Sequence, residues 1–191
     1  MDKLTASRIT GGNTAYKRSE SDFYPTPADV TLALLDFLNI PKGTRIWEPA
    51  AGAGDMVRAL GSRGYEVIGT DIQQGDDFLE LPLPDRVGMI ITNPPFSASE
   101  DFIKHALELG VPFAFLLKSQ YWHAARRYAI FEEAAPRFIL PLTWRPDFLF
   151  KQRGGGAPLM DVMWCVWQPP MRGGVTIYCP LRRPKEDERH E

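Results

Sequence analysis

Short apolar segments alternate with helical patterns over most of this chain, and that alternation constrains the fold more than any other feature. Strand patterns occur at residues 45–48, 65–71, 87–92 and 111–118. Helical patterns occur at residues 28–38, from about residue 55, at 99–110 and at 121–135. An alternating order of this kind predicts a parallel sheet that is covered by helices on both faces.

The alternation stops near residue 136. Residues 137–142 and 159–168 are both strand-like, and no strong helical pattern separates them. Two successive strands without a crossover helix pair in an antiparallel manner. We therefore expect an α/β fold whose sheet is mainly parallel and ends in an antiparallel pair joined by a long loop.

The composition is that of one globular domain, with 44% hydrophobic and 24% charged residues in a chain of 191. No apolar run approaches the roughly 20 residues that span a membrane, and the first residues lack the apolar core of a secretory signal. The two cysteines cannot form a disulfide framework, which makes a reducing, cytoplasmic setting the default expectation. We expect a flexible leader at 1–22, a single domain at 23–180 and a disordered charged tail at 181–191.

A glycine turn follows the first strand pattern. Gly52 and Gly54 lie between that strand and a helix, where glycines let the backbone approach a ligand. Val57 replaces the third glycine of the dinucleotide fingerprint, and Glu48 on the strand would repel phosphate. A carboxylate there suits a ligand with an amino group, such as the methionyl ammonium of S-adenosylmethionine. An ordinary turn remains the alternative.

Two acidic residues follow the second strand pattern. Asp71 closes that strand, where a carboxylate can accept hydrogen bonds from both hydroxyls of a ribose. Asp77 and Phe78 come next, and they could bind an adenine amino group and cover its ring. The alternatives are a solvated acid at the end of the strand, and a polar loop followed by a core phenylalanine.

The third strand ends in the sequence Asn93-Pro94-Pro95-Phe96. Two adjacent prolines remove two backbone donors and fix two φ angles, and they push Asn93 into an extended conformation. This is a rigid way to present an amide, a carbonyl and an aromatic ring at the carboxyl edge of a sheet, where open α/β folds bind ligands.

These motifs together resemble those of the S-adenosylmethionine-dependent amino-methyltransferases, specifically the DNA adenine-N6 group. The resemblance rests on residues 48–54 (EPAAGAG), 93–96 (NPPF) and 23–27 (FYPTP), and it covers about residues 22–170. The set is similar to the small adenine methyltransferases of phages and prophages, including those of restriction-modification. It implies a Rossmann-like class I methyltransferase fold, with a seven-stranded, mainly parallel sheet and an antiparallel terminal strand.

The resemblance also implies site residues. The methionyl, ribose and adenine parts of S-adenosylmethionine would be held by Glu48, Gly52, Asp71 and Asp77, and the methionine carboxylate by Thr26 and Tyr24. The full set of residues implied for the cofactor is Tyr24, Thr26, Glu48, Pro49, Ala50, Gly52, Gly54, Asp71, Ile72, Asp77, Phe78 and Asn93. The catalytic residues would be Asn93, Pro94, Pro95 and Phe96.

The chemistry of an adenine amino group explains why such residues are needed. Its lone pair is delocalised into the ring, so the nitrogen is a poor nucleophile. Asn93 Oδ1 and the Pro94 carbonyl could accept its two hydrogens and draw it toward tetrahedral geometry, ready for direct in-line methyl transfer. Phe96 could stack on the target base once it leaves the duplex. No metal is required, and the three histidines are scattered.

Other substrates remain open. RNA adenine and protein glutamine carry similar amino groups, and a noncatalytic S-adenosylmethionine-binding module is a third possibility. Cytosine-C5 transfer needs a nucleophilic cysteine in an exposed loop. Neither Cys165 nor Cys179 fits that role, because both lie in apolar strand-like segments.

Contact with DNA would need a local basic patch, because the formal net charge is −2. Basic and aromatic residues interleave after the fourth strand and in the long loop, as expected for phosphate contact and base stacking. The candidates for nucleic-acid binding are Lys118, Arg126, Arg127, Phe148, Lys151 and Arg153. A solvated helix face and a loop anchored by core aromatics form the alternative.

Overall fold

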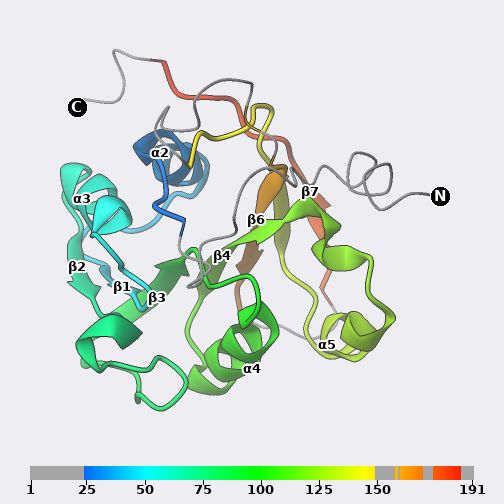
Figure 1. Cartoon of the computed structure of the whole chain (residues 1–191), viewed down its shortest axis with the longest axis horizontal. Helices are drawn as coiled ribbons and strands as arrows, with labels where there is room; N and C mark the ends of the chain where they lie inside the picture. Colours follow the sequence, from blue (N-terminus) through cyan, green and yellow to red (C-terminus); the bar gives the residue numbers. More distant parts are fainter. Residues whose placement is uncertain (1–23, 149–157, 159, 170–173, 186–191) are drawn as a thin grey trace, which may run out of the picture.

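A central seven-stranded sheet organises the protein in a computed structural model that describes residues 24–148, 158, 160–169 and 174–185 (Figure 1). The strand order is β2-β1-β3-β4-β6-β5-β7. The strands are β1 (Arg45–Glu48), β2 (Glu66–Gly69), β3 (Val87–Thr92), β4 (Phe113–Lys118), β5 (Phe138–Pro141), β6 (Val162–Trp167) and β7 (Ile177–Tyr178).

Strands β2, β1, β3 and β4 run parallel to one another, as the alternating sequence pattern predicts. Strand β6 lies antiparallel to both β4 and β5, and β7 pairs with β5 in parallel at the edge. All six residues of β6 are buried, because it sits between two strands and under both helical layers. The mainly parallel sheet with an antiparallel strand near its end is therefore confirmed.

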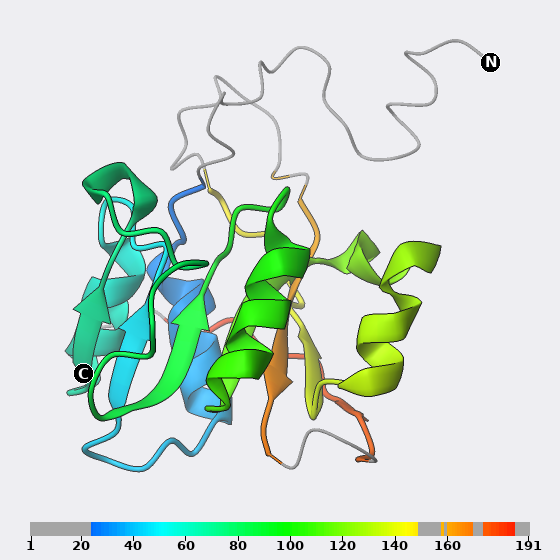
Figure 2. The ribbon, with the colours of Figure 1, turned by 90° about the horizontal axis from the view of Figure 1, so that it is seen from below.

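Helices cover both faces of the sheet (Figure 2). Helices α2 (Ala28–Phe37) and α3 (Asp55–Ser62) pack on one face, where Val30, Leu34 and Leu60 join a single apolar cluster. Helices α4 (Ser99–Leu109) and α5 (Tyr128–Glu133) pack on the other, through Phe102 and Ile130. The expected three-layer arrangement is confirmed by these two clusters.

The predicted helix at 121–135 is wrong in its extent. The segment instead forms the 3₁₀ helices η2 (Ser119–Trp122) and η3 (Ala125–Arg127), followed by the short helix α5. The Arg127 guanidinium folds back, lies 3.9 Å from the centroid of the Tyr121 ring and donates to the Tyr121 carbonyl at 2.6 Å. A side chain thus satisfies a carbonyl that a continuous helix would bond through its backbone.

Strand β2 also differs from the prediction of a buried strand at 65–71. It spans Glu66–Gly69 at one edge of the sheet, with two of its residues half-buried and two exposed. It has a neighbouring strand, β1, on one side alone, so the sheet cannot cover it fully.

The charged tail begins later than the predicted residue 181. Leu181 is buried, its amide donates to the Pro141 carbonyl at 2.8 Å, and it forms a parallel bridge with Leu142. Arg183 Nε lies 2.7 Å from Oδ2 of the buried Asp29 at the start of α2. Apolar burial and backbone pairing hold residues 181–183 on the domain. The expected leader at 1–22 and residues 186–191 lie outside the described residues.

Within the described ranges, no helix is long and apolar enough to cross a membrane. Within the same ranges, no group of three or more His, Cys, Asp or Glu residues could hold a metal ion. Cys165 is buried in β6, and burial raises the pKa of its thiol well above the usual value. A thiol in this environment packs in the core and is a poor nucleophile.

The packing of Leu181 predicts a stability effect. Leu181→Ala should lower the free energy of unfolding by about 2–5 kcal/mol, because it removes a buried leucine and leaves a cavity. Arg182→Ala, at the exposed neighbouring position, is the matched control and should change it little. Chemical denaturation of both variants measures the difference. Equal stabilities would place Leu181 outside the cooperative core.

Candidate active site

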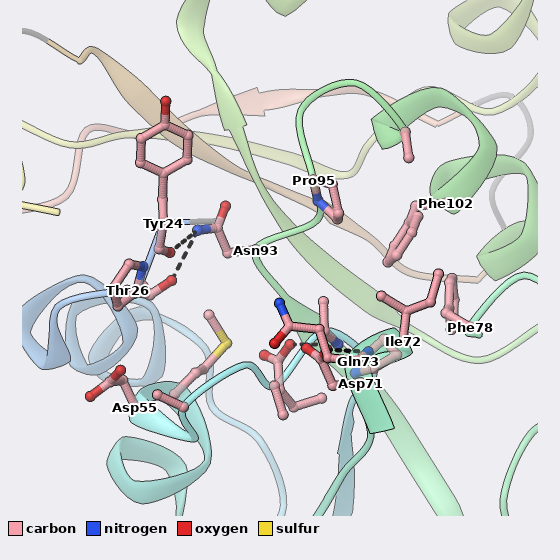
Figure 3. Close-up of a pocket in the computed structure, with 18 of the residues that line it drawn as sticks. Tyr24, Thr26, Asp55, Asp71, Ile72, Gln73, Phe78, Asn93, Pro95 and Phe102 are labelled. Carbon is pink, nitrogen blue, oxygen red and sulfur yellow. Dashed lines mark hydrogen bonds between the residues drawn. The ribbon is translucent and has the colours of Figure 1, made fainter. Parts of the chain in front are cut away.

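A pocket lies at the carboxyl ends of β1, β2 and β3, beside the segment that leads into α2 (Figure 3). One polar residue lies at or just beyond the end of each strand, namely Glu48 in β1, Asp71 after β2 and Asn93 after β3. The lining residues are Tyr24, Pro25, Thr26, Glu48, Pro49, Ala50, Ala51, Ala53, Asp55, Met56, Asp71, Ile72, Gln73, Asp77, Phe78, Leu79, Asn93, Pro95, Ala98 and Phe102.

Glu48 is the most deeply buried acidic residue of the pocket, with 1% of its surface exposed. Its Oε1 accepts hydrogen bonds from Thr92 Oγ1 at 2.5 Å and from the Ala50 amide at 3.1 Å. Its Oε2 is buried without a hydrogen-bond partner among the described residues. Burial raises the pKa of this carboxyl to about 8, and the nearby charge of Asp71 adds to the rise. A positively charged ligand group would stabilise the ionised form.

Asp71 fixes the glycine turn against the end of β2. Its Oδ2 accepts from the Gly52 amide at 2.7 Å and its Oδ1 from the Gln73 amide at 2.9 Å. Gly52 and Gly54 have φ angles of 50° and 80°, in the left-handed region that favours glycine. Each carboxylate oxygen retains a further lone pair, so Asp71 can still accept bonds from a pocket ligand.

The far end of the pocket is apolar. Phe78 is buried, and its ring contacts those of Trp47 and Phe102, with centroids 5.1 and 4.7 Å apart. Ile72 lies at the same end of the pocket and is 65% exposed. Asp77, which precedes Phe78 in the sequence, also lines the pocket, and its Oδ1 accepts from the Leu79 amide at 3.0 Å. A flat apolar ring with a polar edge fits such a space.

Asn93 is held in one orientation by a segment distant in sequence. Its Nδ2 donates to the Tyr24 carbonyl at 3.1 Å and to Thr26 Oγ1 at 3.0 Å (Figure 3). The Tyr24 carbonyl can only accept, so the amide nitrogen must face it and the amide oxygen must face away. That oxygen, Oδ1, is buried and has no hydrogen-bond partner among the described residues.

The residues after Asn93 form a fixed loop into α4. The Pro95 carbonyl accepts from the Ala98 amide at 2.9 Å, and Ser99 Oγ lies 3.2 Å from the Pro95 carbonyl and 3.1 Å from that of Phe96. The Phe96 ring lies under the Lys118 ammonium, 4.1 Å from its centroid, and 5.6 Å from the Tyr24 ring. The loop therefore places the Phe96 ring beside the pocket, where Lys118 at the end of β4 covers it.

Ten of the residues predicted for the cofactor line this one pocket, and so does Pro95 of the predicted catalytic set. The other four, Gly52, Gly54, Pro94 and Phe96, do not line it and shape the turns around it. The lining residues that the sequence patterns did not predict are Pro25, Ala51, Ala53, Asp55, Met56, Gln73, Leu79, Ala98 and Phe102. Pro25, Ala51 and Ala53 lie within the quoted motifs, whereas the helical patterns around Met56 and Phe102 indicated core packing only.

The residues predicted to bind nucleic acid do not gather at one surface in the part of the chain that the structure describes. Lys118 lies over Phe96, whereas Arg126 pairs with Glu100 at 3.5 Å and Arg127 binds Tyr121 within the fold. Phe148 is 4% exposed and packs edge-on against the Tyr24 ring, so the structure does not place it at an open surface. Lys151 and Arg153 lie outside the described residues.

The raised pKa of Glu48 predicts a pH effect on stability. Between about pH 4.5 and pH 8 the folded protein keeps a proton on Glu48 that the unfolded chain has lost, so rising pH lowers the free energy of unfolding. Glutamine has no carboxyl to titrate, so Glu48→Gln should not lose stability in this way. At pH 8 its free energy of unfolding should exceed that of the wild type by on the order of a few kcal/mol.

Urea titrations of wild type, Glu48→Gln and the exposed control Glu80→Gln at several pH values test this expectation. The stability advantage of Glu48→Gln should shrink as pH falls toward 4.5, and Glu80→Gln should follow the wild type. A constant difference at all pH values would contradict the assigned shift.

Comparison with known proteins bears on the fold. No family model matches the sequence, and no curated protein matches it. A solved structure of a candidate class I S-adenosylmethionine-dependent methyltransferase from Listeria monocytogenes is similar, with a TM-score of 0.59 and 15% identity over 94% of this chain and 71% of that chain. A candidate RNA methyltransferase from Pyrococcus horikoshii is also similar, with a TM-score of 0.54 and 17% identity over 88% of this chain and 99% of that chain.

A modification subunit of a candidate type I restriction enzyme from Vibrio vulnificus is also similar, with a TM-score of 0.53 and 16% identity. That match covers 96% of this chain, which spans about half (52%) of the subunit. Identities this low inform on the fold alone. The strand order, the helical layers and these likenesses agree: the chain has the fold of the class I S-adenosylmethionine-dependent methyltransferases.

Proposed function

We propose that this protein transfers a methyl group from S-adenosylmethionine to the N6 amino group of adenine in DNA. The observation that carries the proposal is the Asn93 amide. Both hydrogens of its Nδ2 are engaged by the segment at 24–26, and its Oδ1 is left as an acceptor without a partner among the described residues. Such an acceptor at the end of a strand, before two prolines, suits a donor amino group.

The residues present fit the cofactor. Glu48 Oε2 would accept the methionyl ammonium, which explains why a buried carboxyl oxygen lacks a partner among the residues described. Asp71 would accept from the ribose hydroxyls, and Asp77 with the apolar walls at Ile72 and Phe78 would hold the adenine ring. S-adenosylmethionine supplies a methyl group on a positively charged sulfur and leaves as S-adenosylhomocysteine.

The chain's own residues would prepare the nucleophile. Asn93 Oδ1 and the Pro94 carbonyl accept the two N6 hydrogens, which draws the nitrogen toward tetrahedral geometry and exposes its lone pair. The lone pair forms the new nitrogen–carbon bond as the carbon–sulfur bond breaks. The nitrogen then carries one surplus proton, which leaves to water past Asn93 Oδ1. The prolines keep both acceptors in place, so little reorganisation is needed.

A nucleic-acid substrate is supported by the neighbourhood of Phe96. The Lys118 ammonium covers its ring, a contact worth about 0.5–1 kcal/mol where it is exposed. Stacking of a base on an aromatic ring is worth about 1–3 kcal/mol. An incoming base could therefore stack on Phe96 with Lys118 beside it, and Lys118 is our candidate for contact with a phosphate. A protein glutamine would offer neither a stacking ring nor a phosphate.

The direct test is methyl transfer from labelled S-adenosylmethionine to unmethylated DNA, to RNA and to a protein extract in parallel. We expect N6-methyladenine in digested DNA, with a loss of at least about 100-fold in Asn93→Ala, since an acceptor used in the transition state is removed. The exposed Asn39→Ala is the matched control and should keep full activity.

Label found only in RNA or only in protein would contradict the proposed substrate while leaving the amino-methyl chemistry. Equal activity of Asn93→Ala and wild type on DNA would contradict the proposed mechanism. Cofactor binding without transfer to any of the three would contradict catalysis altogether.

The role of Lys118 can be measured through salt dependence. Lys118→Gln should weaken DNA binding and reduce the slope of log affinity against log salt by about 1, because one phosphate contact is lost. Lys42→Gln removes the same charge from an exposed position before β1, at the opposite edge of the sheet. Fluorescence anisotropy with a labelled oligonucleotide measures both variants. An unchanged slope in Lys118→Gln would exclude Lys118 from the interface.

A further inference from the structure

We propose that Thr26 is a positioning residue whose hydroxyl couples cofactor binding to the orientation of the catalytic amide of Asn93. The inference rests on the proposed function and adds a physical link between its two halves. The link consists of a single side-chain oxygen, Thr26 Oγ1, which accepts from Asn93 Nδ2 at 3.0 Å while Thr26 also lines the cofactor pocket.

The hydrogen-bonding capacity of a hydroxyl makes the link possible. Threonine has one donor hydrogen and two acceptor lone pairs. The bond from Asn93 occupies one lone pair, so the hydroxyl hydrogen remains for an acceptor on a pocket ligand, such as the methionyl carboxylate. A hydroxyl that donates becomes a stronger acceptor, because hydrogen bonds in a chain polarise one another. A bound carboxylate would therefore tighten the bond between Thr26 and Asn93.

Thr26 can act in this way because its own position is fixed. It is 5% exposed and lies two residues before the start of α2. The first turn of α2 is tied to the sheet, since Trp164 Nε1 donates to the Val30 carbonyl at 3.0 Å. Arg183 holds Asp29 of the same turn at 2.7 Å. Thr26 Oγ1 is therefore held in a fixed position, and the bond that it accepts from Asn93 orients the Asn93 amide.

Removal of the hydroxyl should release the amide. In Thr26→Val one hydrogen of Asn93 Nδ2 loses its acceptor, and only the bond to the Tyr24 carbonyl remains. With one anchor, the amide nitrogen stays near Tyr24 but the plane of the amide can tilt, and Oδ1 no longer points in a single direction. Cofactor affinity and the rate at saturating cofactor should both fall, whereas a residue that binds only cofactor would alter affinity alone.

The chain offers a matched control in Thr31. It lies in α2, five residues after Thr26, is fully buried, and its Oγ1 has no hydrogen-bond partner among the described residues. Thr31→Val therefore makes the same chemical change without breaking an anchor. Thr26→Ser keeps the hydroxyl and should rescue whatever Thr26→Val loses.

The first readout is the binding of S-adenosylhomocysteine by calorimetry, which needs no methyl acceptor. We expect an affinity loss on the order of tenfold in Thr26→Val, and values close to wild type in Thr26→Ser and Thr31→Val. The second readout is the Asn93 side-chain amide in proton–nitrogen spectra, identified by its absence in Asn93→Ala. The two signals of the Asn93 side-chain amide should shift when S-adenosylhomocysteine binds to the wild-type protein. In Thr26→Val this shift should be lost.

The outcomes separate the two proposals. Full affinity in Thr26→Val, or an Asn93 amide that responds as in wild type, would overturn the coupling and leave the proposed function standing. A lowered affinity with an unchanged rate at saturating cofactor would also overturn it, since Thr26 would then only bind cofactor. Failure of the wild-type protein to bind S-adenosylhomocysteine would overturn the proposed function and, with it, the coupling.

Discussion

A carboxyl group buried at the end of β1 sets the character of this site. Glu48 is held by Thr92 from β3 and by the Ala50 amide of the glycine turn, so it joins two neighbouring strands and the loop between strand and helix. Burial raises its pKa to about 8, so the carboxyl is stable in the pocket either when it is protonated or when a cation lies beside it. The ionised carboxylate would repel the phosphate of a dinucleotide and attract an ammonium group. The buried carboxyl of Glu48 therefore favours a ligand with a positively charged group in this pocket.

The part of the site around Asn93 depends on contacts between segments that are far apart in the sequence. Asn93 ends β3, yet its amide is oriented by Tyr24 and Thr26 at the entry to α2, and that entry is fixed in turn by Trp164 of β6 and by Arg183. The C-terminal segment that packs as part of the domain therefore contributes, through α2, to the orientation of the Asn93 amide. The segment at 24–26 thus lines the pocket and also orients the Asn93 amide, so the proposed cofactor site and the proposed acceptor would share one wall.

Local sequence patterns predicted the sheet, its antiparallel strand and the gathering of Glu48, Asp71 and Asn93, because the carboxyl ends of parallel strands meet at one edge. They could not predict contacts that depend on packing between distant segments. The anchoring of Asn93 by Thr26, the cover of Lys118 on Phe96 and the burial of Leu181 are of this kind. The break at 119–133 was missed because Arg127 replaces a backbone bond with its own side chain, which no periodicity reports.

The most direct test of Glu48 as the receptor for the methionyl ammonium is the number of protons exchanged when S-adenosylhomocysteine binds at about pH 6.5. At that pH the ligand's amino group is already charged, because α-amino groups have pKa values of about 7.7–8.0, and Glu48 is protonated. Calorimetry in buffers of different ionisation enthalpy should report the release of nearly one proton per ligand in wild type and none in Glu48→Gln. Binding without proton release, or equal release by both proteins, would contradict this account of the site.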